Sequence, residues 1–440
     1  MDKRDIIISE AVESLIKNNG GTVVLSTGTG KTKMVLDFIL RDSRNTEGEV
    51  YNVVLVGSRV LLEEVWKQEL KKWGFKNKYG FIYEHKDTPK PIKFEFKTSQ
   101  LIYKYENPLP EKYNLLVVDE IHSVVTKEYS NIFNIVKYDK VIGLTGTPFG
   151  KDEEEKLELY NRYCPIIFTY TNSSKDGIIN KRQYFIIEHV LDNDHKFLVQ
   201  FKTGKFYKGE LDLYTYYDSK SQEYKKKLID LVEIERNTNP FYKIYDIKKE
   251  LKEDIWEIAV TWGWKKQGTK EQNAIAYNYL RTVQARKNLL LLSNTRADVA
   301  LQIKNKIREK DHEARIVLFS ELNDQLEKIT DNKIYSKNNR DTNTYNLKRF
   351  NSNEVKEIGG CNSLNTSANL KNTKYGILES YVGSTINTRQ RFGRLDRLSP
   401  DDIAYAFIIK TKNTQMEKWF RDAMKDIDLS RAEVININEL

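Results

Sequence analysis

The sequence predicts an α/β fold built on parallel sheets, and two observations lead to this prediction. Short runs of apolar, mostly β-branched residues at 23–25, 53–56, 115–118 and 141–144 alternate with segments whose apolar residues recur at helical spacing. Each run is followed by a polar turn. Parallel α/β sheets bind their ligands beyond the carboxyl ends of the strands, so these turns are expected to share one binding edge.

The first polar turn, at residues 26–32, reads STGTGKT. Gly28 and Gly30 allow backbone N–H groups to approach an anion, and the helix expected to begin near Lys31 adds positive potential at its N-terminus. Lys31 is expected to reach the β- and γ-phosphates of a nucleotide, and the Thr32 hydroxyl to hold Mg²⁺. The predicted phosphate-binding residues are Thr27, Gly28, Thr29, Gly30, Lys31 and Thr32.

Two adjacent carboxylates follow the third apolar run. Asp119 and Glu120 would be costly to place at the end of a buried strand unless a cation or phosphate site lies there. Asp119 is expected to hold Mg²⁺, and Glu120 to orient and deprotonate an attacking water. The alternative is an ordinary pair of surface carboxylates without a catalytic role.

A cluster of arginines lies far downstream. Arg394 and Arg397 fall three residues apart on one face of a helix predicted from about residue 385 to 398, with Gln390 one turn before Arg394. Phosphoryl transfer needs positive charge at the γ-phosphate, and arginines of a second domain supply it when the two domains close. The alternative is a solvated basic helix.

The chain length of 440 residues suits roughly two or three domains. We predict a first domain at 1–175 and a second at 176–440, with an elaboration at about 190–310. The elaboration is expected to begin with a hairpin of strands at 197–201 and 206–211, followed by a mostly helical segment.

Three tryptophans of this segment, Trp256, Trp262 and Trp264, lie beside lysines. We interpret them as packing residues, with stacking on exposed bases as the alternative.

The composition is that of a water-soluble chain with a net charge of +9, which suggests a polyanionic partner. No apolar run is long enough to span a bilayer, and the first residues lack a signal-peptide core. Cys164 and Cys361 are too few and too far apart for a disulfide framework or a metal site, and the five histidines are scattered. These features predict a protein of a reducing compartment, the cytoplasm.

Four motifs at 26–32, 119–122 (DEIH), 145–148 (TGTP) and 390–397 (QRFGRLDR) resemble motifs I, II, III and VI of superfamily 2 helicases, in the same order and at similar spacing. The DExH form is similar to phage recombination and branch-migration helicases and to the motor subunits of restriction enzymes. The resemblance covers nearly the whole chain. It implies two RecA-like domains that close on ATP and Mg²⁺ at their interface and step along a nucleic-acid strand.

The resemblance also implies roles for single residues. His122 would contact the γ-phosphate and, with Gln390, link it to motif III and to domain closure. Residues 364–370 resemble motif V. The implied nucleic-acid contacts are Ser58 and Arg59 of motif Ia, Thr98 and Gln100 of the following phosphate-contact motif, and Ser320 of motif IV.

The sequence therefore predicts an ATP-driven DNA helicase or translocase that acts on single-stranded, forked or branched DNA in replication, recombination or repair. We expect it in the cytoplasm, or in the host cytoplasm if a phage encodes it, and a monomer is the simplest expected state. Two alternatives remain open. One is an RNA helicase of the same superfamily, and the other is a nucleic-acid-stimulated ATPase that clamps or remodels a complex without unwinding.

Overall fold

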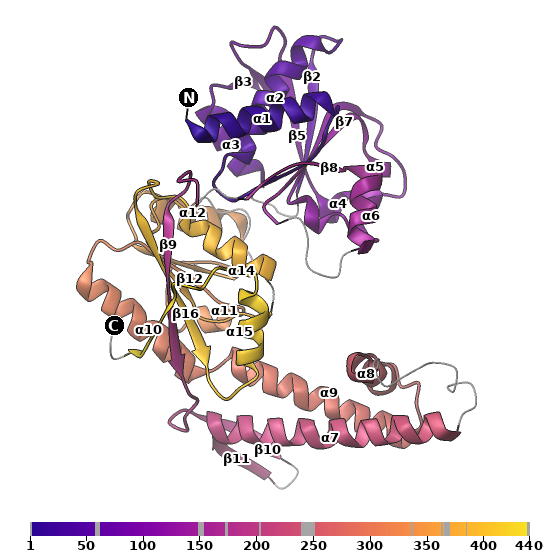
Figure 1. The fold of residues 1–440 in the computed structure, drawn as a ribbon, viewed down its shortest axis with the longest axis vertical. Helices are drawn as coiled ribbons and strands as arrows, with labels where there is room; N and C mark the ends of the chain where they lie inside the picture. The colour runs from indigo at the N-terminus through magenta and orange to yellow at the C-terminus, as the bar shows by residue number, and fades with distance from the viewer. Residues whose placement is uncertain are drawn as a thin grey trace.

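The protein consists of two α/β domains and a helical arm that projects from the second domain, as Figure 1 shows. This computed structural model describes residues 2–57, 62–147, 154–171, 175–201, 204–238, 251–335, 338–361, 364, 370–383 and 385–437. Within these residues every helix is too short or too polar to cross a bilayer.

The first domain is built on an eight-stranded sheet with the order β3-β4-β5-β2-β6-β7-β1-β8. The strands β5, β2, β6, β7, β1 and β8 pair in parallel, whereas β3 and β4 add an antiparallel edge. The parallel sheet expected from the apolar runs is therefore confirmed. The strands are β1 Gly21–Leu25, β2 Tyr51–Gly57, β3 Lys76–Tyr79, β4 Ile82–Glu84, β5 Ile92–Thr98, β6 Lys112–Asp119, β7 Lys137–Thr145 and β8 Ile166–Tyr170.

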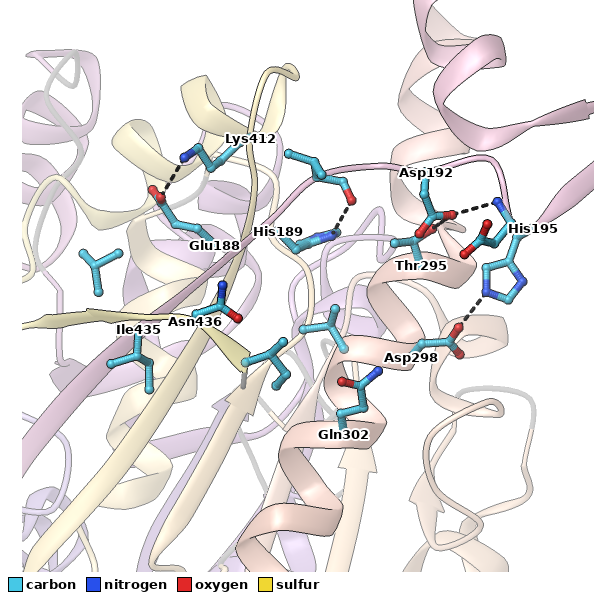
Figure 2. Close-up of a pocket in the computed structure, with 15 residues that line it drawn as sticks. Glu188, His189, Asp192, His195, Thr295, Asp298, Gln302, Lys412, Ile435 and Asn436 are labelled. Atoms are coloured by element: carbon cyan, nitrogen blue, oxygen red, sulfur yellow. Dashed lines mark hydrogen bonds and ion pairs between the residues drawn. The ribbon is translucent and has the colours of Figure 1, made fainter. Parts of the chain in front are cut away.

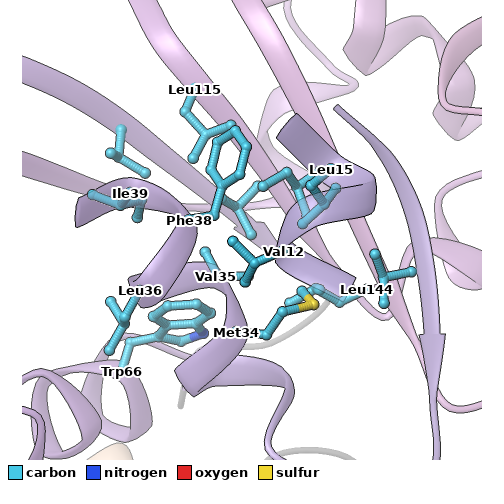
Figure 3. Close-up of a cluster of buried hydrophobic side chains, with 14 of the residues drawn as sticks. Val12, Leu15, Met34, Val35, Leu36, Phe38, Ile39, Trp66, Leu115 and Leu144 are labelled. Carbon is cyan, nitrogen blue, oxygen red and sulfur yellow. The ribbon is translucent and has the colours of Figure 1, made fainter. Parts of the chain in front are cut away.

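Helices cover both faces of this sheet. On one face, Val12 and Leu15 of α1 (Lys3–Lys17) and Val35 and Phe38 of α2 (Lys31–Asn45) pack on strand residues such as Leu115, as Figure 3 shows. The apolar residues of α2 recur at helical spacing, so this helix presents one continuous stripe to the sheet. The other helical segments are α3 Leu62–Lys72, α4 Ser99–Ile102, η1 Ile121–Ser123, η2 Tyr129–Asn131, α5 Ile132–Ile135 and α6 Glu154–Tyr163.

The second domain contains a seven-stranded sheet with the order β13-β14-β12-β15-β16-β9-β17, in which all neighbours are parallel. Its strands are β9 Lys181–His189, β12 Ile316–Phe319, β13 Lys333–Ile334, β14 Glu357–Gly360, β15 Tyr375–Leu378, β16 Ile403–Thr411 and β17 Glu433–Ile435. Its helical segments are α10 Asn294–Lys310, α11 Asn323–Leu326, α12 Arg340–Asn351, α14 Thr385–Phe392, η5 Gly393–Leu395 and α15 Met416–Met424.

The domain boundaries differ slightly from those predicted. Ile178 and Ile179 still pack into the core of the first domain, and the second sheet begins only at Lys181, so the boundary lies near residue 180 rather than 175. The helix α10 packs its apolar residues against β12 and β16 of the second domain. The elaboration therefore ends with the preceding helix and does not extend to residue 310.

The arm begins with a hairpin of β10 (Lys196–Phe201) and β11 (Gly204–Gly209), which confirms the predicted hairpin. Three helices follow: α7 (Glu210–Thr238), α8 (Leu251–Ala259) and α9 (Lys270–Leu291), with a π-helical turn after α8. The helices α7 and α9 lie side by side, and α8 packs on them on the side toward the first domain (Figure 1).

Candidate active site

The phosphate-loop residues form the expected turn between β1 and α2. Gly28 and Gly30 have φ angles of 83° and 111°, a backbone conformation that residues with a Cβ rarely adopt. The Lys31 ammonium group lies across the loop and donates to the carbonyl oxygen of Leu25 at 3.4 Å. It also lies beside motif III, because a Cβ built on Gly146 would be 3.3 Å from Lys31 Nζ. The loop therefore has the left-handed glycines and the neighbouring lysine that the predicted phosphate turn needs.

The two carboxylates stand at the end of β6. Burial and the neighbouring carboxylate of Glu120 raise the pKa of Asp119, whereas the charges of Lys31 and Arg394 oppose this rise. Glu120 has a left-handed backbone with φ 51°, which is strained for a residue with a side chain. Its Oε2 atom is buried and makes no hydrogen bond to the part of the chain that the structure describes. A strained residue with an unsatisfied buried oxygen is suited to act on a bound water.

His122 connects these carboxylates to motif III. Its Nδ1 atom lies 3.4 Å from Glu120 Oε2 and 2.9 Å from the Thr145 hydroxyl. The Thr145 hydroxyl in turn accepts a hydrogen bond from the Thr147 backbone N–H at 3.1 Å. The ends of β6 and β7 are therefore joined through side chains directly beside Lys31.

Motif VI of the second domain lies against the phosphate loop of the first. A Cβ built on Gly28 would be 3.0 Å from the carbonyl oxygen of Asp396, and one built on Gly393 would be 2.9 Å from Thr27. Arg394 is buried in this contact, and its positive charge acts on Asp119. The structure thus brings Arg394 to the carboxylates from the opposite domain.

Arg397 does not share a helical face with Arg394, and this part of the prediction is wrong. The helix α14 ends at Phe392, Arg394 lies in the following 3₁₀ turn, and Arg397 comes after that turn. Glycine is a poor residue for a helix interior, and Gly393 is required here by its close approach to Thr27. Burial lowers the pKa of Arg397 to about 10, and the carboxylate of Glu69 on α3 opposes this shift. Arg397 therefore lies near a different part of the first domain.

Two further residues of motif VI are buried. Gln390 is buried on α14, as a residue that links closure to the site would be. Arg391, to which the sequence assigned no role, donates to the carbonyl oxygen of Ser380 at 2.8 Å and pairs with Glu321 at 2.9 Å. Arg391 therefore anchors α14 to its own domain, a role that its position in an arginine cluster does not reveal.

The expected nucleic-acid contacts have different outcomes. Thr98 is half-buried at the end of β5, and Gln100 is exposed at the start of α4, where a strand could reach it. Ser58, Arg59 and most of the motif V segment, including residues 365–369, lie outside the described residues.

Ser320 is the expected nucleic-acid contact that the structure contradicts. It is fully buried, and its hydroxyl lies 3.1 Å from the Ser380 hydroxyl. The same hydroxyl also accepts from the backbone N–H of Leu322 at 3.2 Å. The Ser320 side chain closes a turn at the end of β12 and does not face a nucleic acid.

The three tryptophans of the arm are only partly packing residues. Trp262 packs on the arm core, but the exposed fractions of Trp256 and Trp264 are 42% and 55%. Their rings meet edge to face with centroids 6.2 Å apart. Trp256 also meets the ring of Tyr279 edge to face with centroids 6.5 Å apart, so the packing interpretation holds only in part for Trp256 and Trp264.

A cavity of about 720 Å³ lies in the second domain, away from the four motifs (Figure 2). Its lining includes Glu188, Asp192, Asp298 and His195. His195 Nε2 lies 2.6 Å from Asp298, and Glu188 pairs with Lys412 at 3.3 Å. A carboxylate-rich wall repels phosphates, so this cavity is not the nucleotide site.

The Mg²⁺ ligands predicted from the sequence would supply only part of the coordination shell of the ion. No cluster of three or more His, Cys, Asp or Glu side chains that could hold a metal ion occurs within the described ranges. Asp119 and the Thr32 hydroxyl would be the two protein ligands, because Mg²⁺ at such sites takes its other ligands from phosphates and water.

The fold and the site define a P-loop protein with two RecA-like domains. Residues 4–150 match the family model described as type III restriction enzyme, res subunit. A DNA 3'-5' translocase XPB2 from Sulfurisphaera tokodaii is 29% identical over 152 residues, which are 34% of this chain and 32% of that protein. The chain thus matches about a third of that relative's length.

The fold of the whole chain is similar to the crystal structure of the Pyrococcus furiosus Hef helicase domain, with a TM-score of 0.50 and 14% identity, over 95% of this chain and 96% of that one. Residues 4–150 are thus similar to the restriction-enzyme family, and the whole chain shares the fold of the Hef helicase domain.

Proposed function

We propose that this protein is an ATP-dependent DNA helicase or translocase that hydrolyses ATP between its two RecA-like domains. The observation that carries the proposal is the contact of Gly393 and Asp396 with the phosphate loop, together with the charge of Arg394 acting on Asp119. This arrangement would surround a γ-phosphate with groups from both domains, as phosphoryl transfer requires.

Each residue of the site has a role that its surroundings support. Lys31 would neutralise the β- and γ-phosphates. Thr32 and Asp119 would hold Mg²⁺, which would supply further positive charge to the phosphates. Glu120 accepts the proton of the attacking water through its unsatisfied oxygen. Arg394 stabilises the charge on the far side of the γ-phosphate.

His122 reports the state of this site to motif III. Because the Thr145 hydroxyl contacts both the His122 ring and the Thr147 backbone, a shift of the Glu120–His122 pair on hydrolysis would move the end of β7. We assign Gln390 a similar role in closure from its buried position on α14.

The nucleic acid is proposed to be DNA, which the similarity to the DNA translocase XPB2 of Sulfurisphaera tokodaii supports. Thr98 and Gln100 of the first domain are proposed backbone contacts, together with Ser58 and Arg59. We also propose a role in replication, recombination or repair, action as a monomer, and a cytoplasmic location, which the two buried free cysteines support.

The test is the rate of ATP hydrolysis with single-stranded DNA, duplex DNA, forked DNA and RNA of matched length. We expect single-stranded or forked DNA to stimulate hydrolysis most, and Lys31→Ala to abolish hydrolysis with every substrate. Stronger stimulation by RNA would favour an RNA helicase. Stimulation without strand displacement or movement would favour a clamping ATPase.

A further inference from the structure

A second cavity, of about 370 Å³, lies where the arm joins the second domain; we call it the elbow cavity. One wall is formed by α9. The other wall is formed by the segment before α14 and by the beginning of α15. The lining residues are Val283, Arg286, Lys287, Leu290, Val382, Gly383, Gln415 and Trp419. In Figure 1 the root of α9 and the helix α15 meet at the inner side of this bend.

The lining of the elbow cavity contains two basic side chains, one of which is ion-paired. These two cations are Arg286 and Lys287, and no carboxylate is among the described residues that line the cavity. Arg286 is held in place by Asp218 of α7 and lies 3.3 Å from the Ser221 hydroxyl. The indole of Trp419 and the amide of Gln415 stand on the opposite wall. Cations, an aromatic face and an amide are the groups with which proteins hold a phosphodiester and its base.

The helix α9, which forms one wall of the elbow cavity, carries positive and no negative charges over most of its length. Between residues 272 and 291, the sequence of α9 contains no Asp or Glu, whereas Arg281, Arg286 and Lys287 are positively charged. Its exposed stripe at helical spacing consists of Tyr277, Arg281, Gln284 and Asn288. The neighbouring helix α7 carries both acidic and basic residues along its length. At helical spacing the exposed stripe and the cavity-lining residues of α9 lie on different faces, so Arg286 and Lys287 bring the charge of α9 to the elbow cavity.

We propose that the elbow cavity binds one nucleotide of a single nucleic-acid strand, with its phosphate at Arg286 and Lys287 and its base against Trp419. The volume is near the lower end of small-ligand pockets, about 300–1,000 Å³, and suits a nucleotide rather than a duplex.

This site deepens the proposed function and rests on it. Gly383 of the cavity wall lies just before α14, the helix that leads into motif VI. A nucleotide in the cavity would therefore contact both the arm and the segment that precedes Arg394. The site would give the strand a contact at the base of the arm, in addition to the contacts proposed for the first domain.

The test compares the binding of fluorescently labelled oligo-dT to full-length variants over a range of salt concentrations. Lys287→Glu should weaken binding by about tenfold or more and reduce the salt slope by about one, because one phosphate contact is lost. Lys226→Glu is the matched control: it makes the same charge change on an exposed position of α7 in the same arm and should change binding less than about twofold.

A second variant tests the base contact separately. Trp419→Leu should weaken binding of oligo-dT by roughly five- to 100-fold and should hardly affect an abasic strand of the same length. Equal losses with both strands would show a packing role for Trp419 and overturn the stacking assignment.

Two outcomes separate this proposal from the proposed function. Wild-type affinity in Lys287→Glu, together with DNA-stimulated hydrolysis by the wild-type protein, overturns the elbow site and leaves the proposed function intact. A loss of affinity in Lys287→Glu but not in Lys226→Glu, in a protein whose hydrolysis DNA does not stimulate, supports the elbow site and refutes the proposed function.

Discussion

The contact between motif VI and the phosphate loop can be tested by adding a single methyl group. A Cβ on Gly393 would lie 2.9 Å from both Cβ and Oγ1 of Thr27 and 3.0 Å from its Cγ2, which is closer than carbon atoms pack. The backbone of Gly393 is not among those with positive φ, so alanine fits its own domain without strain. Gly393→Ala therefore opposes domain closure without affecting the fold of either domain.

The size of the effect follows from the cost of overpacking. Inserting a methyl group into a packed contact costs about 1–3 kcal/mol. At about 1.4 kcal/mol per tenfold change, the closed form becomes roughly five- to 150-fold less populated. We expect the DNA-stimulated rate of ATP hydrolysis to fall by a factor in this range, while the unfolding temperature stays unchanged.

The assay is steady-state ATP hydrolysis at saturating DNA, beside nucleotide binding at equilibrium. The double variant Gly393→Ala with Thr27→Gly removes all three contacting atoms of Thr27 and should recover part of the activity lost relative to Thr27→Gly alone. A Gly393→Ala variant with wild-type stimulated turnover would refute the closed arrangement as the catalytic one.

Three further predictions concern single side chains. Arg394→Ala should lower the DNA-stimulated rate of ATP hydrolysis by about three orders of magnitude or more. Arg394→Lys should not restore this rate, because an ammonium group lacks the planar fork of the guanidinium. Steady-state rates measure both effects, and retained stimulation in Arg394→Ala would make Arg394 a solvated basic residue. Glu120→Gln should bind ATP but not hydrolyse it, since the base is lost and the Mg²⁺ ligand Asp119 remains; an equal loss of affinity and turnover would indicate a structural role instead. Burial, followed by the charge of Arg296, lowers the pKa of His189 to about 4, so His189 stays neutral in the folded protein while the unfolded chain takes up a proton below about pH 6.5. The contribution of His189 to stability is therefore full above about pH 6.5 and declines as the pH falls toward 4. His189→Gln should reduce the difference between the urea unfolding midpoints measured at pH 7 and pH 5. An unchanged difference would mean that the His189 ring is not the group that titrates.

The sequence was sufficient to predict the parts of the fold that local patterns determine. The apolar runs that became β1, β2, β6 and β7 are buried on both faces of a parallel sheet, so each is continuous and easy to recognise. The residues that follow them meet at one edge because parallel strands end there. The positions of Lys31, Asp119 and His122 around one site follow from this geometry.

Contacts between distant parts of the chain could not be predicted in the same way. The end of α14 at Phe392 depends on the approach of Gly393 to Thr27, which lies in the other domain. Ser320 is buried because its hydroxyl meets that of Ser380, a residue of another strand end. Neither relation leaves a periodic signal in the sequence.

The arm illustrates the same limit. Its hairpin was predictable from two short strands around a glycine, but the exposure of Trp256 and Trp264 depends on how α8 packs on its neighbours. The elbow cavity joins α9 to α15, which are separated by much of the second sheet in the sequence. Only the absence of acidic residues between residues 272 and 291 of α9 could have indicated it.

The central claim, that hydrolysis between the two domains drives movement along DNA, is tested most directly by displacement of streptavidin from end-biotinylated single-stranded DNA. We expect ATP to accelerate displacement by the wild-type protein, and Glu120→Gln to remove this acceleration while it still binds the DNA. If streptavidin dissociates only at its spontaneous rate although the same DNA stimulates ATP hydrolysis, this result would contradict a translocase and indicate a clamp.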